Sequence, residues 1–407
     1  MRRTLFYGWV VVGAAFVSHF LSYGTLVVAF GLFLPAMAES LQLSRAALSG
    51  TFGLARLVSA AVAPVFGVLV DRGGPRRLTA LGTLLLAAGA LLLAGAHTGW
   101  HVVLGYAVVM AIGGVALGEL SADATVTRWF VRRRGRALAV ATMGLSTAGI
   151  VVPLPLAYAI THLGWRGAWV VMAVTVALLG TVAALAMRTR PEDHGLVADG
   201  GAASGEAPTE RSLTARQALA TPAFWLLLVG TNLGGLALFG VNIHLYSYLG
   251  DRGLAPATAA AAVTLLYVLH TAAKPIWGLI AERFHVRYCI AACYAGGGAG
   301  LLILLTSPSL AAVLAFTVVY GLTRGAQSFV TSLAWAEYFG REAQGAIRGL
   351  AAPARFVASA AGPVLGGWLY DATGRYESAL LAFALAFVLG GLVAATARAP
   401  VMRPRAA

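Results

Sequence analysis

Long runs of uncharged apolar residues follow one another along almost the whole of this 407-residue sequence. Many are close to the roughly 20 residues that an α-helix needs to cross a bilayer. A transmembrane β-strand is shorter and alternates in polarity, so these runs predict helices. The composition agrees, because 59% of the residues are hydrophobic and 11% are charged, whereas soluble domains have roughly 45–50% and 25%. We therefore expect an all-α membrane protein.

Twelve of the runs are long enough to be membrane-spanning helices. They lie at about 8–34, 47–70, 78–96, 102–126, 136–160, 167–187, 223–248, 258–281, 288–306, 310–335, 345–369 and 377–397. Residues 189–220 are rich in glycine, alanine, proline and acids, which predicts a flexible linker. The sequence thus divides into a six-helix half at 1–188, this linker, and a second six-helix half at 221–407.

The basic residues are divided unequally between the two ends of these helices. Of the 29 present, 21 fall on one side, Arg348 among them, and only Arg45, Arg166, Arg252 and Arg375 fall on the other. The positive-inside rule then puts both termini and the linker in the cytoplasm, and we expect a multi-pass protein of the inner membrane. The net charge of +14 is an orientation signal that suits anionic membrane lipids. It does not require a nucleic-acid partner.

Two short motifs occur once in each half at nearly the same separation. Gly67-Val-Leu-Val-Asp71-Arg72 follows the second predicted helix, and Gly278-Leu-Ile-Ala-Glu282-Arg283 follows the eighth, 211 residues later (278 minus 67). Trp129-Phe130 ends the fourth helix and Tyr338-Phe339 ends the tenth, 209 residues later (338 minus 129). Parallel repeats of this kind build transporters whose halves move about a central site.

The motif G-x-x-x-[DE]-R, followed here by Gly-Gly-Pro-Arg-Arg, resembles the signature loop of the major facilitator superfamily. With twelve helices and a second copy of the motif, the resemblance covers nearly the whole chain. It implies the fold of that family and a gate at the cytoplasmic face. There the glycine lets two helices approach, and the charged groups cap helix ends and form charge-assisted bonds. The gate residues are expected to be Gly67, Asp71, Arg72, Arg76, Glu282 and Arg283.

Shorter stretches resemble the monocarboxylate transporter branch, which also includes oxalate–formate exchangers. One is Tyr7-Gly8-Trp9-Val10-Val11, and another is Arg128-Trp129-Phe130 with Arg133-Arg134 before the fifth helix. The stretches 336–340 and 366–374 look like those of bacterial members. This resemblance implies transport of a small organic anion.

Lys274 is the only lysine in the chain, and it lies in the apolar segment LLYVLHTAAKPIWGLI. A cation at mid-bilayer costs at least about 2.5 kcal/mol, so it usually has a partner or a function. The alternatives are a structural ion pair and a ligand for the substrate. Tyr267, His270 and Lys274 lie at positions i, i+3 and i+7 and so share one helix face. The resemblance implies that Lys274 binds a carboxylate, where the family has a bidentate arginine, and that His270 stands where the family has an acid.

Glu119 and Asp123 are four residues apart on the fourth helix and share a face. Two nearby carboxylates in a low dielectric do not both stay ionised cheaply, so they are candidate proton carriers, as is His270. The other interpretation is that this pair neutralises Arg56 or Arg128.

The remaining polar groups inside predicted helices are hypotheses about the same site. The exchangers use a buried cation in the eleventh helix, so Arg355 is expected to help Lys274 hold an anion. Arg324 either lines the cavity or braces two helices. Further contacts are expected from His19 and Tyr23, which share a face of the first helix, and from Asn242.

We therefore predict a proton-coupled transporter of monocarboxylates that works by alternating access, with the anion between the two halves. Anion exchange, efflux of amphipathic compounds and ligand sensing without transport are the alternatives. No catalytic triad, nucleotide loop or metal-ligand cluster stands out, and the only cysteines, Cys289 and Cys293, lie four apart on one helix. We expect no enzyme activity, no cofactor and no metal, and we infer no obligate protein partner.

Overall fold

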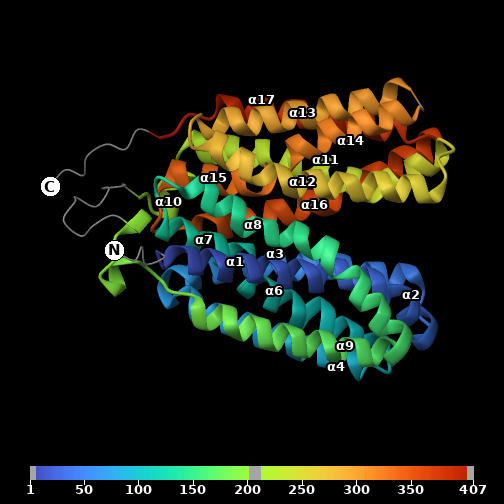
Figure 1. The fold of residues 1–407 in the computed structure, drawn as a ribbon, viewed down its shortest axis with the longest axis horizontal. Coiled ribbons are helices and arrows are strands. Elements are labelled where there is room, and N and C mark those ends of the chain that lie inside the picture. Colours follow the sequence, from blue (N-terminus) through green and yellow to red (C-terminus); the bar gives the residue numbers. More distant parts are fainter. Residues whose placement is uncertain (1–5, 201–211, 308, 401–407) are drawn as a thin grey trace, which may run out of the picture. The chain divides into compact units, whose positions relative to one another are not determined.

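The computed structural model describes residues 6–200, 212–307 and 309–400, and the regular structure in these ranges is helical (Figure 1). By the density of internal contacts the chain forms two compact units. Unit 1 is Met1–Thr209 together with Gln344–Pro353, and unit 2 is Glu210–Ala343 together with Ala354–Ala407. The short segment 344–353 therefore groups with unit 1, although it lies within the second half of the sequence.

Unit 1 contains the helices from α1 to α9 and four shorter or irregular helices. They are α1 (Gly8–Tyr23), the π-helix η1 (Gly24–Ala29), α2 (Phe30–Leu41), α3 (Arg45–Gly73), α4 (Pro75–Ala94), α5 (Gly99–Val102), the π-helix η2 (Val103–Met110), α6 (Ala111–Leu117), α7 (Glu119–Trp129), α8 (Arg134–Val151), α9 (Pro153–Ala186), and the 3₁₀ turns η3 (Glu192–His194) and η4 (Ala198–Gly200).

Unit 2 contains the helices from α10 to α17, apart from the first turns of α16. They are α10 (Ala215–Leu219), α11 (Pro222–Asp251), α12 (Pro256–Ala281), α13 (Val286–Thr306), α14 (Leu310–Arg324), α15 (Gln327–Phe339), α16 (Gln344–Thr373) and α17 (Glu377–Thr396).

Within the described ranges, ten helices are long and apolar enough to cross a membrane. This is fewer than the twelve runs for two reasons. The predicted fifth run is divided between α8 and the beginning of α9, and α9 continues through the sixth, with a break at Gly164 (φ 70°, ψ 166°). The predicted eleventh run is α16, which carries Arg348 and Arg355 and is not among the ten.

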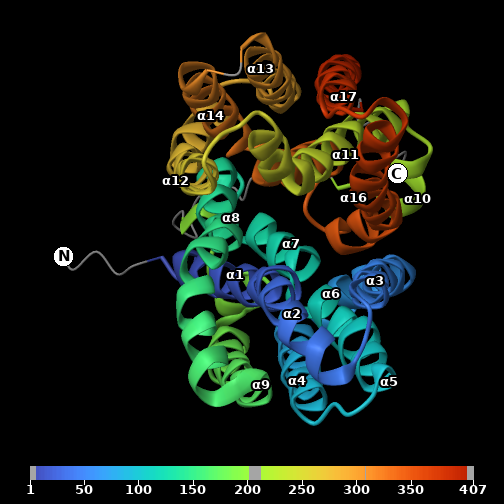
Figure 2. The same ribbon diagram turned by 90° about the vertical axis from the view of Figure 1, so that its right-hand side faces the viewer.

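The helices of unit 1 pack around α1, which contacts α7, α8 and α9, while α4 packs against α6 and α9 (Figure 2). Helix association in a membrane depends on close packing rather than on expulsion of water. A Cβ on Gly144 of α8 would collide with the carbonyl oxygen of Phe16, so glycine permits the contact between α8 and α1. Elsewhere aromatic rings fill the core, for example Phe33 on Trp169 with ring centroids 3.9 Å apart.

In unit 2, α13 packs against α14 and α17, α11 packs against α17, and α12 packs against α14. The contact of α14 with α12 is especially close at Gly325, directly after α14. A Cβ there would lie 3.0 Å from the Cβ of Ala273 and nearer still to the carbonyl oxygen of His270. Gly325 therefore allows the end of α14 to approach the middle of α12.

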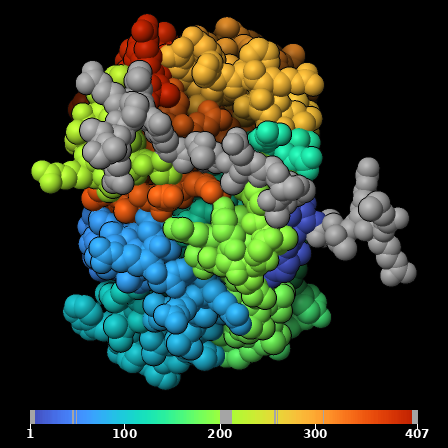
Figure 3. All heavy atoms as spheres, turned by 90° about the vertical axis from the view of Figure 1, so that its left-hand side faces the viewer, coloured from blue at the N-terminus to red at the C-terminus, as the bar shows by residue number. Residues whose placement is uncertain are grey.

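The two ends of the predicted linker have defined structure. Asp199 accepts hydrogen bonds from the backbone N–H groups of Val131, Arg132 and Arg133 (3.0, 2.6 and 3.1 Å). Residues 190–200 therefore lie against unit 1 near the connection between α7 and α8 (Figure 3). At the other end, Thr214 and Gln217 form a capping box that begins α10. The middle of the linker, residues 201–211, lies outside the described residues.

Candidate functional site

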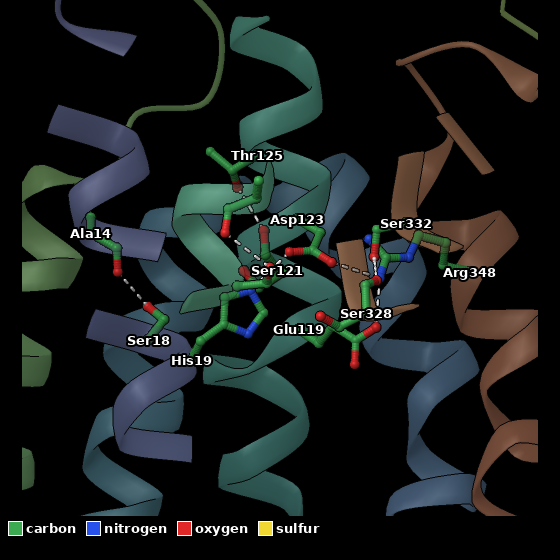
Figure 4. Close-up of polar contacts among 12 residues, drawn as sticks. Ala14, Ser18, His19, Glu119, Ser121, Asp123, Thr125, Ser328, Ser332 and Arg348 are labelled. Atoms are coloured by element: carbon green, nitrogen blue, oxygen red, sulfur yellow. Dashed lines mark hydrogen bonds and ion pairs between the residues drawn. The ribbon is translucent and has the colours of Figure 1, made fainter. Parts of the chain in front are cut away.

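Ionisable side chains gather at two places, one within each unit. The group in unit 1 consists of His19 on α1, Glu119 and Asp123 on α7, and Arg348 on the first turns of α16 (Figure 4). We call these four residues the ion network.

The fourth predicted helix breaks directly before the acids of this network. Gly118, between α6 and α7, has a non-helical backbone (φ −77°, ψ −149°), and a Cβ there would lie 2.8 Å from the hydroxyl oxygen of Ser22. Because of the break, Glu119 is the first residue of α7, where the positive end of the helix dipole favours a carboxylate. Asp123 follows one turn later on the same face.

Asp123 is bound on both carboxylate oxygens. Its Oδ1 lies 2.8 Å from Nε2 of His19, and its Oδ2 accepts a 3.0 Å hydrogen bond from Nη2 of Arg348. The same Nη2 donates to Oε1 of Glu119, also at 3.0 Å. The side chains of His19 and Asp123 are fully buried and that of Arg348 is 7% exposed, whereas that of Glu119 is 28% exposed. Buried charges of this kind are costly unless each has a partner.

The ion network carries a net charge. With His19 neutral, its four side chains hold two negative charges and one positive charge. Nε2 of His19 and Oδ1 of Asp123 lie within hydrogen-bonding distance, and among the described residues Nδ1 of His19 is buried without a hydrogen-bond partner. Ionisable groups buried inside a helical bundle are candidates for a function.

A second attachment holds the start of α16 within unit 1. Asp71, near the end of α3, accepts hydrogen bonds from the backbone N–H groups of Gly345 (3.1 Å) and Ala346 (2.7 Å). These N–H groups have no partner within their own helix, so Asp71 caps α16. Asp71 also forms an ion pair with Arg128 (2.5 Å). Part of the predicted gate, Gly67 and Asp71, thus contacts the first turn of α16.

The other predicted gate residues lie on the surface or near it. Arg72, Arg76 and Arg283 are exposed, and Glu282 is partly exposed. Their part in a gate stays a prediction.

The group in unit 2 lies where α14 approaches α12, and we call it the cationic cluster. Lys274 is fully buried, and Arg324 is 6% exposed. The charges of both act on His270, and the ring of Tyr267 lies 6.2 Å from that of His270. Two cations are therefore buried in the same part of one unit.

Arg324 is held by two neighbours in this cluster. Its Nη1 donates a 3.0 Å hydrogen bond to Oδ1 of Asn242 on α11, and its guanidinium carbon lies 5.5 Å from the ring centroid of Tyr320. Tyr320 is fully buried, and among the described residues its hydroxyl has no hydrogen-bond partner. Arg324 thus links α14 to α11 and stands beside a hydroxyl group that has no hydrogen-bond partner among the described residues.

The predicted site residues are divided between the two units. His19 is bound to Asp123 in unit 1, whereas Asn242 joins the cationic cluster in unit 2. Arg56 lies over the ring of Phe52 (4.8 Å), and Arg355 lies over the ring of Phe356 (5.3 Å). The expected roles of Tyr23 and Arg355 in substrate binding stay predictions.

The structure shows a partner of the two acids that the sequence did not suggest. One interpretation paired Glu119 and Asp123 with Arg56 or Arg128; the structure places the guanidinium of Arg348 between the two acids, and Arg128 pairs with Asp71. Arg348 had been counted among the cytoplasmic arginines, although it is nearly buried. One available signal was its place inside the predicted eleventh helix, where a charge needs a partner.

Comparison with known proteins identifies the family. The model of the Major Facilitator Superfamily matches residues 14–269 and 246–406, which together span almost the whole chain. The chain belongs to the Major Facilitator Superfamily. Among solved members of this superfamily, the proton:xylose symporter XylE bound to a bromo-deoxyglucose superposes with a TM-score of 0.72, at 14% identity and over 95% of this chain and 94% of the symporter. At that identity the likeness shows the fold alone.

Several of the relatives found by sequence are monocarboxylate transporters. Monocarboxylate transporter 11 of Mus musculus is 30% identical over 399 residues, covering 95% of this chain and 86% of the relative. The Homo sapiens protein of the same name is 29% identical over 390 residues, covering 92% of this chain and 79% of the relative. These matches confirm the monocarboxylate side of the resemblance. They give no support to its bacterial and oxalate–formate side.

Proposed function

We propose that this superfamily member is a secondary transporter of the inner membrane that carries a small organic anion, a monocarboxylate, together with a proton. The observation that carries the proposal is the cationic cluster: Lys274 is fully buried and Arg324 nearly so, at the place where the end of α14 approaches the middle of α12. The names of the mammalian relatives point to the same class of substrate.

The charge balance of unit 2 supports an anionic cargo. Helices α12, α13 and α14 contain no aspartate or glutamate, and α11 has only Asp251, its last residue. These four helices therefore contain a single acid, at the end of α11. A carboxylate between Lys274 and Arg324 would offset the cost of burying both cations. Lysine presents one ammonium rather than a planar fork, which suits a single carboxylate oxygen and leaves the second to another donor.

Proton coupling is proposed from the ion network. Glu119 and Asp123 share the guanidinium of Arg348 in a buried setting, so uptake of a proton by one acid changes which ion pairs form among these groups. Transport would proceed by alternating access, with the capping of α16 by Asp71 as part of a cytoplasmic gate. The distribution of arginines supports cytoplasmic termini.

The test is uptake of a labelled short-chain monocarboxylate into proteoliposomes with an imposed pH gradient. We expect accumulation inside when the interior is alkaline, and loss of accumulation in Lys274→Met. A matched control is Arg216→Gln, because Arg216 is an exposed cation on α10. If uptake ignores the gradient and follows a counter-loaded anion instead, the protein is an exchanger. If amphipathic cations are moved and Lys274→Met has no effect, the proposed cargo is wrong.

A further inference from the structure

We infer that Asp123 is the proton site of the transport cycle and that Arg348 is the positioning residue that makes the attachment of α16 depend on that proton. This inference rests on the proposed function as a proton-coupled carrier. It assigns to two residues what the sequence left open among Glu119, Asp123 and His270.

The geometry favours Asp123 over Glu119. Asp123 is fully buried and is bound by His19 and Arg348, whereas Glu119 is 28% exposed and water can compensate its charge. A proton on Asp123 therefore removes a charge that only His19 and Arg348 balance within the network. Protonated His19 can deliver that proton, because its Nε2–H bond breaks as the O–H bond to Oδ1 of Asp123 forms. Neutral imidazole and a neutral carboxylic acid remain.

Arg348 is the part of the network that responds. Its Nη2 is shared between Asp123 and Glu119, and a charge-assisted hydrogen bond is roughly twice as strong as a neutral one. When Asp123 becomes neutral, the bond from Arg348 to Asp123 loses its charge assistance, while the bond to the more exposed Glu119 keeps it. The first turns of α16 are then held less tightly to α7.

The rest of the attachment does not change with this proton. Asp71 holds the backbone N–H groups of Gly345 and Ala346, and its own charge is balanced by Arg128. Gly67 packs against α16 so closely that a Cβ would collide with the carbonyl oxygen of Gly345. The bond from Arg348 to Asp123 thus depends on this proton. The cap by Asp71 and the packing of Gly67 do not, and they define the position to which residues 344–353 return.

The charged groups on the helices packed around α7 have other assigned contacts or lie at the surface. Arg134 on α8 donates to the carbonyl oxygens of Phe130 and Thr127, and Asp199 on η4 binds backbone N–H groups. Among the described side chains, the ionisable groups on those elements are His19 and Tyr23 on α1, Arg56, Asp71 and Arg72 on α3, Arg76 and Arg77 on α4, Glu119 and Arg128 on α7, Arg134 and Arg136 on α8, Asp199 on η4, and Arg348 on the first turns of α16. Of these, His19 and Arg348 form ion pairs with Asp123.

Pro353 marks where α16 is able to bend. The grouping of α16 changes from unit 1 to unit 2 between Pro353 and Ala354. Proline has no N–H, so the helix lacks the hydrogen bond that would otherwise join this position to Gly349. The ten residues 344–353 can therefore loosen as one segment while the remainder of α16 keeps its helix.

The experiment measures how accessible this segment is as pH changes, without any substrate. Ile347 is fully buried next to Arg348. It is changed to cysteine in a background where Cys289 and Cys293 are serine, and its maleimide labelling rate is followed from about pH 8 to pH 5.5. Arg216→Cys in the same background corrects for ionisation of the thiol, because position 216 is exposed. We expect the corrected rate to rise about tenfold as the pH falls, which is the effect of losing one charge-assisted bond.

Four variants identify the groups involved. Asp123→Asn and Arg348→Gln should label fast at every pH, Arg348→Lys should keep the pH dependence, and Glu119→Gln should keep it as well. A pH dependence that survives in Asp123→Asn would overturn the inference, as would a flat profile in the parent. If Asp123→Asn does not fold, loss of the dependence in Glu119→Gln would overturn it instead.

The labelling separates this inference from the proposed function. If labelling at position 347 depends on pH but no carboxylate is taken up, the proton site stands and the proposed cargo is wrong. If uptake follows the pH gradient but the labelling does not depend on pH, the proposed function stands and Asp123 and Arg348 have no part in the coupling. If the role of Arg348 were purely structural, replacing it would lower stability equally at all pH values, and Arg348→Lys would not restore the pH dependence of labelling.

Discussion

Replacing Arg348 by methionine would leave two acids of α7 without the guanidinium that lies between them. Methionine fills much of the same volume, so the change removes charge rather than packing. Removing one partner of a buried ion pair typically costs about 3–5 kcal/mol. Asp123 is fully buried, but Glu119 is 28% exposed and is partly compensated by water. We therefore expect a loss of about 3 kcal/mol in the free energy of unfolding at pH 8.

Asp123→Asn should cost less, about 1–2 kcal/mol, because Arg348 keeps its bond to Glu119. In the double variant Arg348→Met with Asp123→Asn, the stranded buried charge is gone. The double change should then cost at least about 1 kcal/mol less than the sum of the two single changes, which is the coupling expected for directly bonded groups.

The assay is equilibrium unfolding in mixed micelles at pH 8. Costs of the two changes that add within about 0.5 kcal/mol, or a cost of Arg348→Met below about 1 kcal/mol, would refute the reasoning.

Two other predictions concern packing and the cationic cluster. Gly67→Leu should destabilise the protein by about 1–3 kcal/mol and abolish uptake, because no side chain fits between α3 and α16. Gly73→Ala should be neutral, because there is open space at its Cβ position. Thermal unfolding and uptake by both variants check this, and a Gly67→Leu protein that still takes up substrate would contradict it. Asn242→Ala should weaken carboxylate binding about three- to tenfold, because Arg324 loses its acceptor. Asn232→Ala should leave binding unchanged, because the Asn232 amide bonds within its own helix. Equal effects of the two changes in a binding titration would argue against a role for Arg324.

The helical class and the burial of single charges could be predicted from the sequence. Long apolar runs fix the length of a membrane helix, and a lone lysine within one of them must be accommodated. Lys274 is indeed fully buried, and Glu119 and Asp123 do share a face, because the i, i+4 relation is local to one helix.

The partners of these charges could not be predicted in the same way. Arg348 lies 229 residues from Glu119, and which turn of α16 meets which turn of α7 depends on the packing of both helices. The break at Gly118 is similarly hidden, because glycine is also ordinary at helix contacts in membranes. Counting arginines by side placed Arg348 among the cytoplasmic residues and so did not reveal that it is buried beside the two acids.

Binding of a labelled short-chain monocarboxylate to the purified protein tests the central claim most directly. The account predicts saturable binding that Lys274→Met reduces at least tenfold and that Lys274→Arg largely keeps, since the charge remains. Binding that is equally tight in Lys274→Met, with both proteins folded, would contradict the assignment of this buried ammonium to an anionic cargo.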